Sequence, residues 1–168
     1  MRGKTKNLLS IPSIFFCLGI CFIACTGDDT GSVIPKIEFI GLTKTRMIQG
    51  DFFEDSLRLL LKFEDGDGDL GFPQNDNRYD ISLTDSRNNQ IQDQYKLPAL
   101  PDSEGRPQKG QMSILVFTSC CLFKDQIPPC SSPPQYPLDS LVYKIVLRDR
   151  GGHVSDTVLS SKVYLECI

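Results

Sequence analysis

The sequence has no tryptophan, a single histidine and no cluster of lysine and arginine residues. Nucleic-acid binding needs a basic face for phosphate contacts, and this chain is acidic, with a formal net charge of −3. Without tryptophan, an aromatic platform for a glycan can come only from tyrosines such as Tyr79, Tyr95 and Tyr136. No segment has the 3.6-residue periodicity of an amphipathic helix. The sequence therefore argues against a nucleic-acid partner and against a helical fold.

Motifs of common enzyme classes are also missing. There is no Gly-x-Ser-x-Gly elbow, phosphate-binding loop or zinc-protease helix motif. Asp149, His153 and Ser155 have the composition of a catalytic triad, but a triad brings together residues from separate elements. Glycoside hydrolysis needs one carboxyl group with a raised pKa in an apolar pocket, for which a glycine-rich open loop is unsuited. We expect a non-catalytic protein; the alternative is a small envelope carbohydrate-active enzyme or accessory with an unrecognised site.

The first 24 residues have the pattern of a secretory signal peptide. Basic residues Arg2, Lys4 and Lys6 precede an apolar run from Leu8 to Ala24 that is short and interrupted for a membrane span of about 20 residues. The run ends in Phe-Ile-Ala-Cys at residues 22–25, which resembles a bacterial lipobox with phenylalanine where leucine is usual. The resemblance implies cleavage before Cys25 and lipidation of that cysteine. The alternative is an ordinary cleavage site followed by an incidental cysteine.

The segment that follows the signal peptide indicates where the protein resides. Residues 26–29, Thr-Gly-Asp-Asp, resemble the export signal of Bacteroidota lipoproteins that reach the outer face of the outer membrane; a solvated linker is the alternative. We expect residues 25–35 to be a lipidated cysteine with a flexible tether, and residues 36–168 to be one domain. Loss of three positive charges with the signal changes the formal charge from −3 to −6. The predicted location is the outer membrane, at the cell surface or on its periplasmic face.

Beyond residue 35 the dominant hydrophobic period is two, which is typical of half-buried strands. Alternating or continuous apolar residues predict strands at residues 37–39, 57–63, 79–84, 91–97, 111–119, 141–148 and 154–165, the last with a bulge. Three prolines and two glycines predict a long exposed loop at residues 98–110. About seven short strands separated by turns predict an all-β fold, a single antiparallel β-sandwich.

The C-terminal part of the chain resembles a known family. The segment from Pro137 to Asp149, followed by the turn at residues 150–153, is similar to the last hairpin of immunoglobulin-like or fibronectin-type-III-like domains. This resemblance implies that Tyr143 closes a corner of the sandwich, whereas the alternative is a tyrosine of the core. The chain departs from antibody domains in lacking tryptophan and in the positions of its cysteines. The whole chain is similar to uncharacterised Bacteroidota lipoproteins, a likeness that implies no activity.

An acidic loop follows the strongest predicted strand. Asp65, Asp67 and Asp69 alternate with glycine, a spacing that suits Ca²⁺, which takes six to eight oxygen ligands. In immunoglobulin-like strand order this loop and the turn at Asp149 lie at the same end of the sandwich. We therefore expect Asp65, Asp67, Asp69 and Asp149 to form a structural calcium site; the alternative is a solvated Asp-Gly turn. If the first two strands are antiparallel, the site lies at the tethered end.

Four cysteines remain after Cys25: Cys120, Cys121, Cys130 and Cys167. An even number in an oxidising compartment indicates two disulfides, with three connectivities open. Zinc is disfavoured because Cys-Cys-x8-Cys is an unusual ligand spacing and only one histidine is present. The immunoglobulin-like order would let one loop cysteine bond Cys167 and another bond Cys130. A bond between the adjacent Cys120 and Cys121 is disfavoured because neighbouring side chains on a strand point to opposite faces.

Two further patterns concern modification and partners. Three triplets consist of aspartate, then serine or threonine, then an apolar residue, and their hydroxyl residues are Ser56, Ser140 and Thr157. This pattern resembles the O-glycosylation signal of Bacteroidota exported proteins. The proline-rich segment 127–137 is either a rigid connector or a surface that presents Tyr136 to a partner. We expect the domain to bind an unidentified protein or glycan, or to be an accessory of a surface complex.

Overall fold

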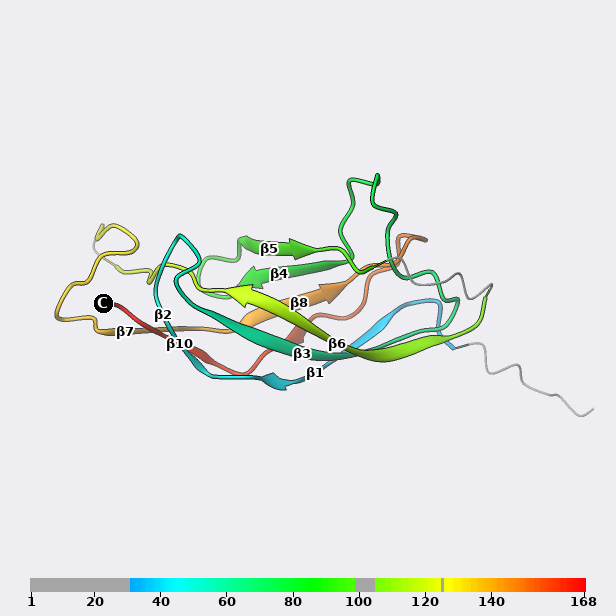
Figure 1. Ribbon diagram of the computed structural model, residues 1–168, viewed down its shortest axis with the longest axis horizontal. Helices are drawn as coiled ribbons and strands as arrows, with labels where there is room; N and C mark the ends of the chain where they lie inside the picture. Colours follow the sequence, from blue (N-terminus) through cyan, green and yellow to red (C-terminus); the bar gives the residue numbers. More distant parts are fainter. Residues whose placement is uncertain (1–30, 99–104, 125) are drawn as a thin grey trace, which may run out of the picture.

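The computed structural model describes residues 31–98, 105–124 and 126–168 (Figure 1). These residues contain ten strands and no helix. Accordingly, no helix among the described residues is long and apolar enough to cross a membrane. The predicted signal peptide, Cys25 and most of the predicted tether lie outside them. The strands are β1 (Lys36–Leu42), β2 (Arg46–Ile48), β3 (Ser56–Asp65), β4 (Ile81–Asp85), β5 (Ile91–Tyr95), β6 (Gln108–Phe117), β7 (Leu138–Leu141), β8 (Tyr143–Leu147), β9 (Val158–Leu159) and β10 (Val163–Glu166).

The strands form three sheets, which confirms the all-β expectation. Their orders are β1-β3-β6, β2-β10-β7 and β5-β4-β8-β9. All pairings are antiparallel except that of β10 with β2. In Figure 1 the ribbon of β1, β3 and β6 lies across the sheet that contains β4 and β8. The third sheet lies toward the C terminus, where β7 almost continues into β8.

Alternation of side chains explains why these segments form strands around one core. In β3, Leu57, Leu59 and Leu61 are fully buried or nearly so, while Arg58 and Lys62 on the opposite face of the strand are exposed. The same inward alternation recurs in β4 and β8, and the buried residues form one hydrophobic cluster. Burying a leucine or isoleucine side chain contributes about 1.5–3 kcal/mol relative to leaving it exposed. The three sheets are therefore held together chiefly by their buried apolar sides.

Two predicted strands are each divided in the structure. The strand expected at residues 141–148 is split at Val142, so that β7 joins β10 while β8 joins β4. The strand expected at 154–165 becomes β9 and β10, which also lie in different sheets. At the first division the Val142 N–H donates to Ser86 Oγ at 2.9 Å, outside any ladder. Hydrophobic alternation continues through such a point and cannot reveal a change of partner strand.

Other boundaries also differ from the sequence prediction. Strand β2 was not predicted, because three residues carry too little periodicity. The expected loop at 98–110 ends earlier, since β6 begins at Gln108 and pairs with Asp65; residues 99–104 lie outside the described residues. Tyr79 precedes β4 and its side chain is 43 % exposed.

Tyr143 is a residue of the core. It is fully buried, and among the described residues its hydroxyl forms no hydrogen bond to the backbone. Burial raises the pKa of its phenol to about 12. The corner-closing hydrogen bond implied by the family resemblance is therefore not formed, and the tyrosine packs as a large apolar ring.

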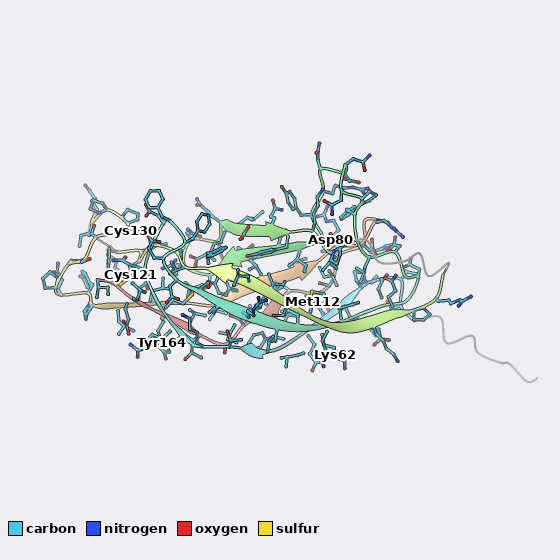
Figure 2. All side chains as sticks on the ribbon, viewed as in Figure 1. Lys62, Asp80, Met112, Cys121, Cys130 and Tyr164 are labelled. Carbon is cyan, nitrogen blue, oxygen red and sulfur yellow. A yellow bond between two sulfur atoms is a disulfide. The ribbon has the colours of Figure 1, made fainter. Side chains whose placement is uncertain are left out.

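The two ends of the molecule differ in their residues. The C-terminal end, which we call the disulfide end, contains the bonds Cys120–Cys130 and Cys121–Cys167; Figure 2 labels Cys121 and Cys130 there. This pairing agrees with the expectation that one loop cysteine bonds Cys167. The nearby Tyr136 ring stacks on Phe123, with centroids 5.9 Å apart. At the opposite end the first described residues meet the loop after β3, where the Gly66 N–H donates to the Ser32 carbonyl at 2.9 Å.

Candidate metal site

The acidic loop begins where β3 ends, at Asp65. Two of its glycines, Gly68 and Gly71, have positive φ angles of 72° and 91°. This left-handed region is readily adopted by glycine and disfavours most other residues. These two positions let the chain fold back on itself, so that its alternating aspartates converge instead of continuing along an extended strand.

Asp80 holds the second half of this loop in place. Its side chain is buried, and its Oδ1 accepts hydrogen bonds from the Gly71 and Phe72 N–H groups at 3.0 and 3.2 Å. Its Oδ2 accepts one from the Leu97 N–H at 2.8 Å. Burial raises the pKa of this carboxyl group, against the lowering effect of the three N–H donors. Figure 2 labels Asp80 in the half of the molecule away from the disulfides; sequence reasoning did not single it out.

Asp149 belongs to the turn after β8 and is the fourth aspartate of the site. It is fully buried, its Oδ1 accepts the His153 N–H at 2.7 Å, and its Oδ2 lies 2.9 Å from His153 Nδ1. The two loops are joined at Asp69, whose carbonyl accepts the Arg150 N–H at 3.2 Å and whose Oδ2 accepts the Gly151 N–H at 2.7 Å. The turn is thus held against the acidic loop by backbone donors.

The structure brings together all four aspartates that were expected to meet. Asp65, Asp67, Asp69 and Asp149 each offer one carboxylate oxygen, and these oxygens lie within 4.8 Å of one another. Asp65, like Asp149, is fully buried, and its Oδ2 accepts the Asp69 N–H at 2.9 Å. The Oδ1 atoms of Asp65, Asp67 and Asp69 are buried and have no hydrogen-bond partner among the residues that the structure describes. We call this region the acidic end.

The electrostatics of the acidic end are unfavourable without a counterion. Burial raises the pKa of Asp65 to about 6, and repulsion from Asp67, Asp69 and Asp149 adds to this. Burial, followed by repulsion from Asp149 and Asp67, also raises the pKa of Asp69. The hydrogen bond to Asp149 raises the pKa of His153. The structure therefore does not support the alternative of a solvated Asp-Gly turn, because the loop buries the Asp65 carboxyl group, which resists ionisation.

A divalent cation fits this chemistry. Buried polar atoms without partners cost free energy, and carboxylates lose more than neutral groups. Ca²⁺ is bound by carboxylate oxygens, carbonyl oxygens and water in flexible geometry. Asp65, Asp67, Asp69 and Asp149 would supply its carboxylates, and the three unpartnered Oδ1 atoms are the free acceptors that such an ion requires.

The other predicted site residues are distributed over the molecule. Ser155 Oγ donates to the Asp156 carbonyl at 2.9 Å and so forms no triad with His153. Ser56 and Ser140 are half-buried in β3 and β7, and Thr157 is exposed before β9. Asp51 lies beside Cys120 and Cys130, but these sulfurs are bonded to each other and are not thiolate ligands. Cys25 lies outside the described residues.

In comparisons with known proteins, no family model, curated protein or solved structure matches this chain.

Proposed function

We propose that this protein is a non-catalytic β-sandwich lipoprotein, anchored through Cys25 to the outer membrane and stabilised by calcium at its acidic end. Its domain, residues 36–168, binds a protein or glycan partner or is an accessory of a surface complex. The lipobox-like end of the apolar N-terminal run supports the anchor. The contact between Ser32 and Gly66 supports a calcium site at the tethered end of the domain.

The sheet orders support an immunoglobulin-like topology. With β1, β3 and β6 as strands A, B and E, and β4, β5, β8 and β9 as C, C′, F and G, the observed orders become A-B-E and C′-C-F-G. In this correspondence the acidic loop is the B–C loop and the turn at Asp149 begins the F–G connection. These two connections lie at the same end of such a sandwich, consistent with the meeting of the four aspartates.

The three buried carboxylate oxygens without partners are the observation that carries the calcium proposal. Simple solvation of an acidic turn leaves such atoms in contact with water, whereas Asp65 is fully buried. Its burial also argues against the alternative of a glycosidase acid at this position, because a saccharide cannot reach a carboxyl group without exposed surface. The expected affinity is about 10⁻⁴ to 10⁻³ M, as in extracellular calcium modules.

Thermal unfolding in calcium and in chelator tests the site. At 10 mM Ca²⁺ we expect the midpoint to rise by roughly 4–10 °C over the value in EGTA, from mass action at the expected affinity. Asp149→Asn should remove most of this shift. Asp76→Asn is the matched control, because Asp76 lies on the same loop but pairs with Arg78. An identical midpoint in calcium and in EGTA would refute the site.

The anchor is tested separately from the metal. In the native host, the chain is expected to incorporate labelled palmitate and to fractionate with the outer membrane, and Cys25→Ala should abolish both. Label incorporation by the Cys25→Ala variant would overturn the assignment of the lipidated residue.

A further inference from the structure

A polar cleft lies on the sheet β5-β4-β8-β9 beside the loop that leads into β4. Its volume is about 370 Å³, within the range of about 300–1,000 Å³ that is usual for small-ligand sites. The residues that line it are Asn77, Arg78, Tyr79, Ser82, Ile91, Gln94 and Arg148. None of them belongs to the candidate metal site.

Strand register explains why these side chains share one face. Ser82 pairs with Gln94 on one side and with Val146 on the other. Because side chains alternate along a strand, Arg148, two residues beyond Val146, projects from the same outward face. The Arg148 N–H donates to the Asp80 carbonyl at 2.7 Å, which holds this backbone beside the start of β4.

The charge of the cleft differs from that of the whole chain. Arg78 is neutralised by Asp76, with Nη2 2.8 Å from Oδ2, and its guanidinium lies over the Phe72 ring at 4.3 Å. Arg148 is exposed, and in the described part of the chain no carboxylate pairs with it. No acidic side chain lines the cleft. On a protein with a formal charge of −3, this cleft thus offers an uncompensated guanidinium to an anion.

The remaining lining suits a saccharide ring. The Tyr79 ring is 43 % exposed and is amphipathic, with an apolar face and a polar hydroxyl. Gln94 Nε2 donates to Ser82 Oγ at 3.2 Å, which orients both polar groups at the floor of the cleft. Amide and hydroxyl side chains provide both donors and acceptors, as the hydroxyls of a sugar require.

We propose that this cleft binds a saccharide that carries carboxylate groups, such as a uronate oligomer. A guanidinium binds a carboxylate through two parallel hydrogen bonds, so Arg148 would bind the uronate carboxylate. Tyr79 would pack against the ring, and Gln94 and Ser82 would bond its hydroxyls. This inference rests on the proposed binding function and names the class of its ligand. The alternation of donors and acceptors favours a saccharide over an acidic peptide, which presents fewer hydroxyls.

Titration calorimetry with hexagalacturonate tests the proposal on the full chain purified from membranes in detergent. EGTA is present throughout, because calcium itself binds uronates and would engage the acidic end. We expect saturable binding by the unmodified chain. Arg148→Ala should weaken it about tenfold, the effect of losing a charge-assisted hydrogen bond, and Tyr79→Ala about fivefold.

The chain offers a matched control pair. Arg46 lies 5.9 Å from the centroid of the Tyr164 ring on the sheet β2-β10-β7, so it is also an arginine beside an exposed tyrosine. Unlike Arg148, it pairs with a carboxylate, that of Glu166 at 3.2 Å. Arg46→Ala and Tyr164→Ala should each change the affinity by less than about twofold, because surface changes away from a site have small effects. Unchanged thermal midpoints in EGTA would show that all four variants are folded.

Three results would overturn the proposal: no binding of hexagalacturonate, equal binding of cellohexaose, or equal binding of a poly-glutamate peptide. Equal weakening by Arg46→Ala and Arg148→Ala would also overturn it, because it would indicate binding by general charge. These outcomes leave the calcium test untouched, since that test measures unfolding without saccharide. Conversely, the absence of a calcium shift together with saccharide binding would refute the metal site alone.

Discussion

At the disulfide end, Arg87 lies between two carboxylates, whereas at the acidic end four carboxylates meet and three of their buried oxygens have no partner within the described part of the chain. Arg87 Nη2 is 2.6 Å from Asp85 Oδ2, and Nη1 is 2.6 Å from Asp139 Oδ2. Its guanidinium also donates to the Cys120 carbonyl and to Ser119 Oγ, each at 3.0 Å. At the disulfide end, both carboxylates bond to a cationic side chain of the protein itself. At the acidic end, we propose that a cation from solution takes this place.

The comparison indicates how the stability of each end responds to conditions. Disulfides and a buried ion pair persist in any calcium concentration, so the disulfide end should be insensitive to chelators. The acidic end should respond to calcium and to pH. Four predictions test this difference, in order of decreasing effect.

The largest effect is expected from Arg87→Met. The side chains of Arg87 and Asp85 are 11 % and 6 % exposed, and removal of one partner leaves a buried charge uncompensated. Breaking such a pair costs about 3–5 kcal/mol of unfolding free energy, measurable by urea denaturation. Arg58→Met is the control, because Arg58 is exposed on β3 and should change stability by about 0.5 kcal/mol or less. A loss below about 1 kcal/mol for Arg87→Met would mean that the ion pair contributes little.

The two disulfides should differ in their contributions. Cys121–Cys167 spans 46 residues of sequence and Cys120–Cys130 spans 10. Loop-closure entropy predicts a loss of about 4 kcal/mol when the first pair is changed to alanine and about 3 kcal/mol for the second. Urea unfolding of Cys121→Ala/Cys167→Ala and Cys120→Ala/Cys130→Ala gives both values. If the shorter loop proved the more important, stabilisation by chain entropy would be the wrong explanation.

At the acidic end, stability in EGTA should fall as pH rises from 4.5 to 8. The folded pKa of Asp65, about 6, lies above its ordinary value of 3.8. Protonated Asp65 therefore contributes to the free energy of unfolding below about pH 4, and this contribution is lost as the pH rises through 6. The raised pKa of His153 acts in the same direction. The pKa of Asp76 is instead lowered from 3.8 to about 2. Ionised Asp76 therefore stabilises the fold above pH 3.8, and this stabilisation is lost only as the pH falls through about 2.

Thermal midpoints measured across this pH range check the prediction. Asp65→Asn should flatten the profile in EGTA, and 10 mM Ca²⁺ should restore the midpoint of the unmodified chain at pH 8. A thermal midpoint in EGTA that rises steadily from pH 4.5 to 8 would contradict the inferred burial and mutual repulsion of the four carboxylates.

Local sequence predicted the acidic end better than the disulfide-end ion pair. Asp-x-Asp-x-Asp with interspersed glycine has a known ligand pattern, and the assumed strand order added Asp149. Arg87 lies only in a turn-rich stretch, and its partner Asp139 is 52 residues away. Nothing in either segment indicates that they meet. Asp80 could not be predicted from local sequence either. An aspartate before a strand has the same local pattern whether it is solvated or accepts three backbone hydrogen bonds.

The strands also differ in how well the sequence predicted them. Inward alternation predicted β1, β3, β4 and β8 because burial of one face leaves a period of two in the sequence. The change from β7 to β8 at Val142 has no such trace, because the same face stays inward while the partner strand changes. Register and partner choice depend on distant segments, and for these the structure was needed.

The smallest effect is expected where the tether meets the acidic loop. A Cβ at Gly66 would lie 2.2 Å from the Gly31 carbonyl oxygen and 2.5 Å from that of Ser32, so Gly66→Ala should displace the tether. Only one backbone hydrogen bond joins these segments in the described residues, so unfolding free energy should fall by about 1 kcal/mol. Trypsin cleavage after Lys36 should nevertheless become faster. Gly41→Ala is the control, because nothing lies within 4 Å of its added Cβ. Equal cleavage of both variants would mean that the acidic loop does not hold the segment before β1 in place.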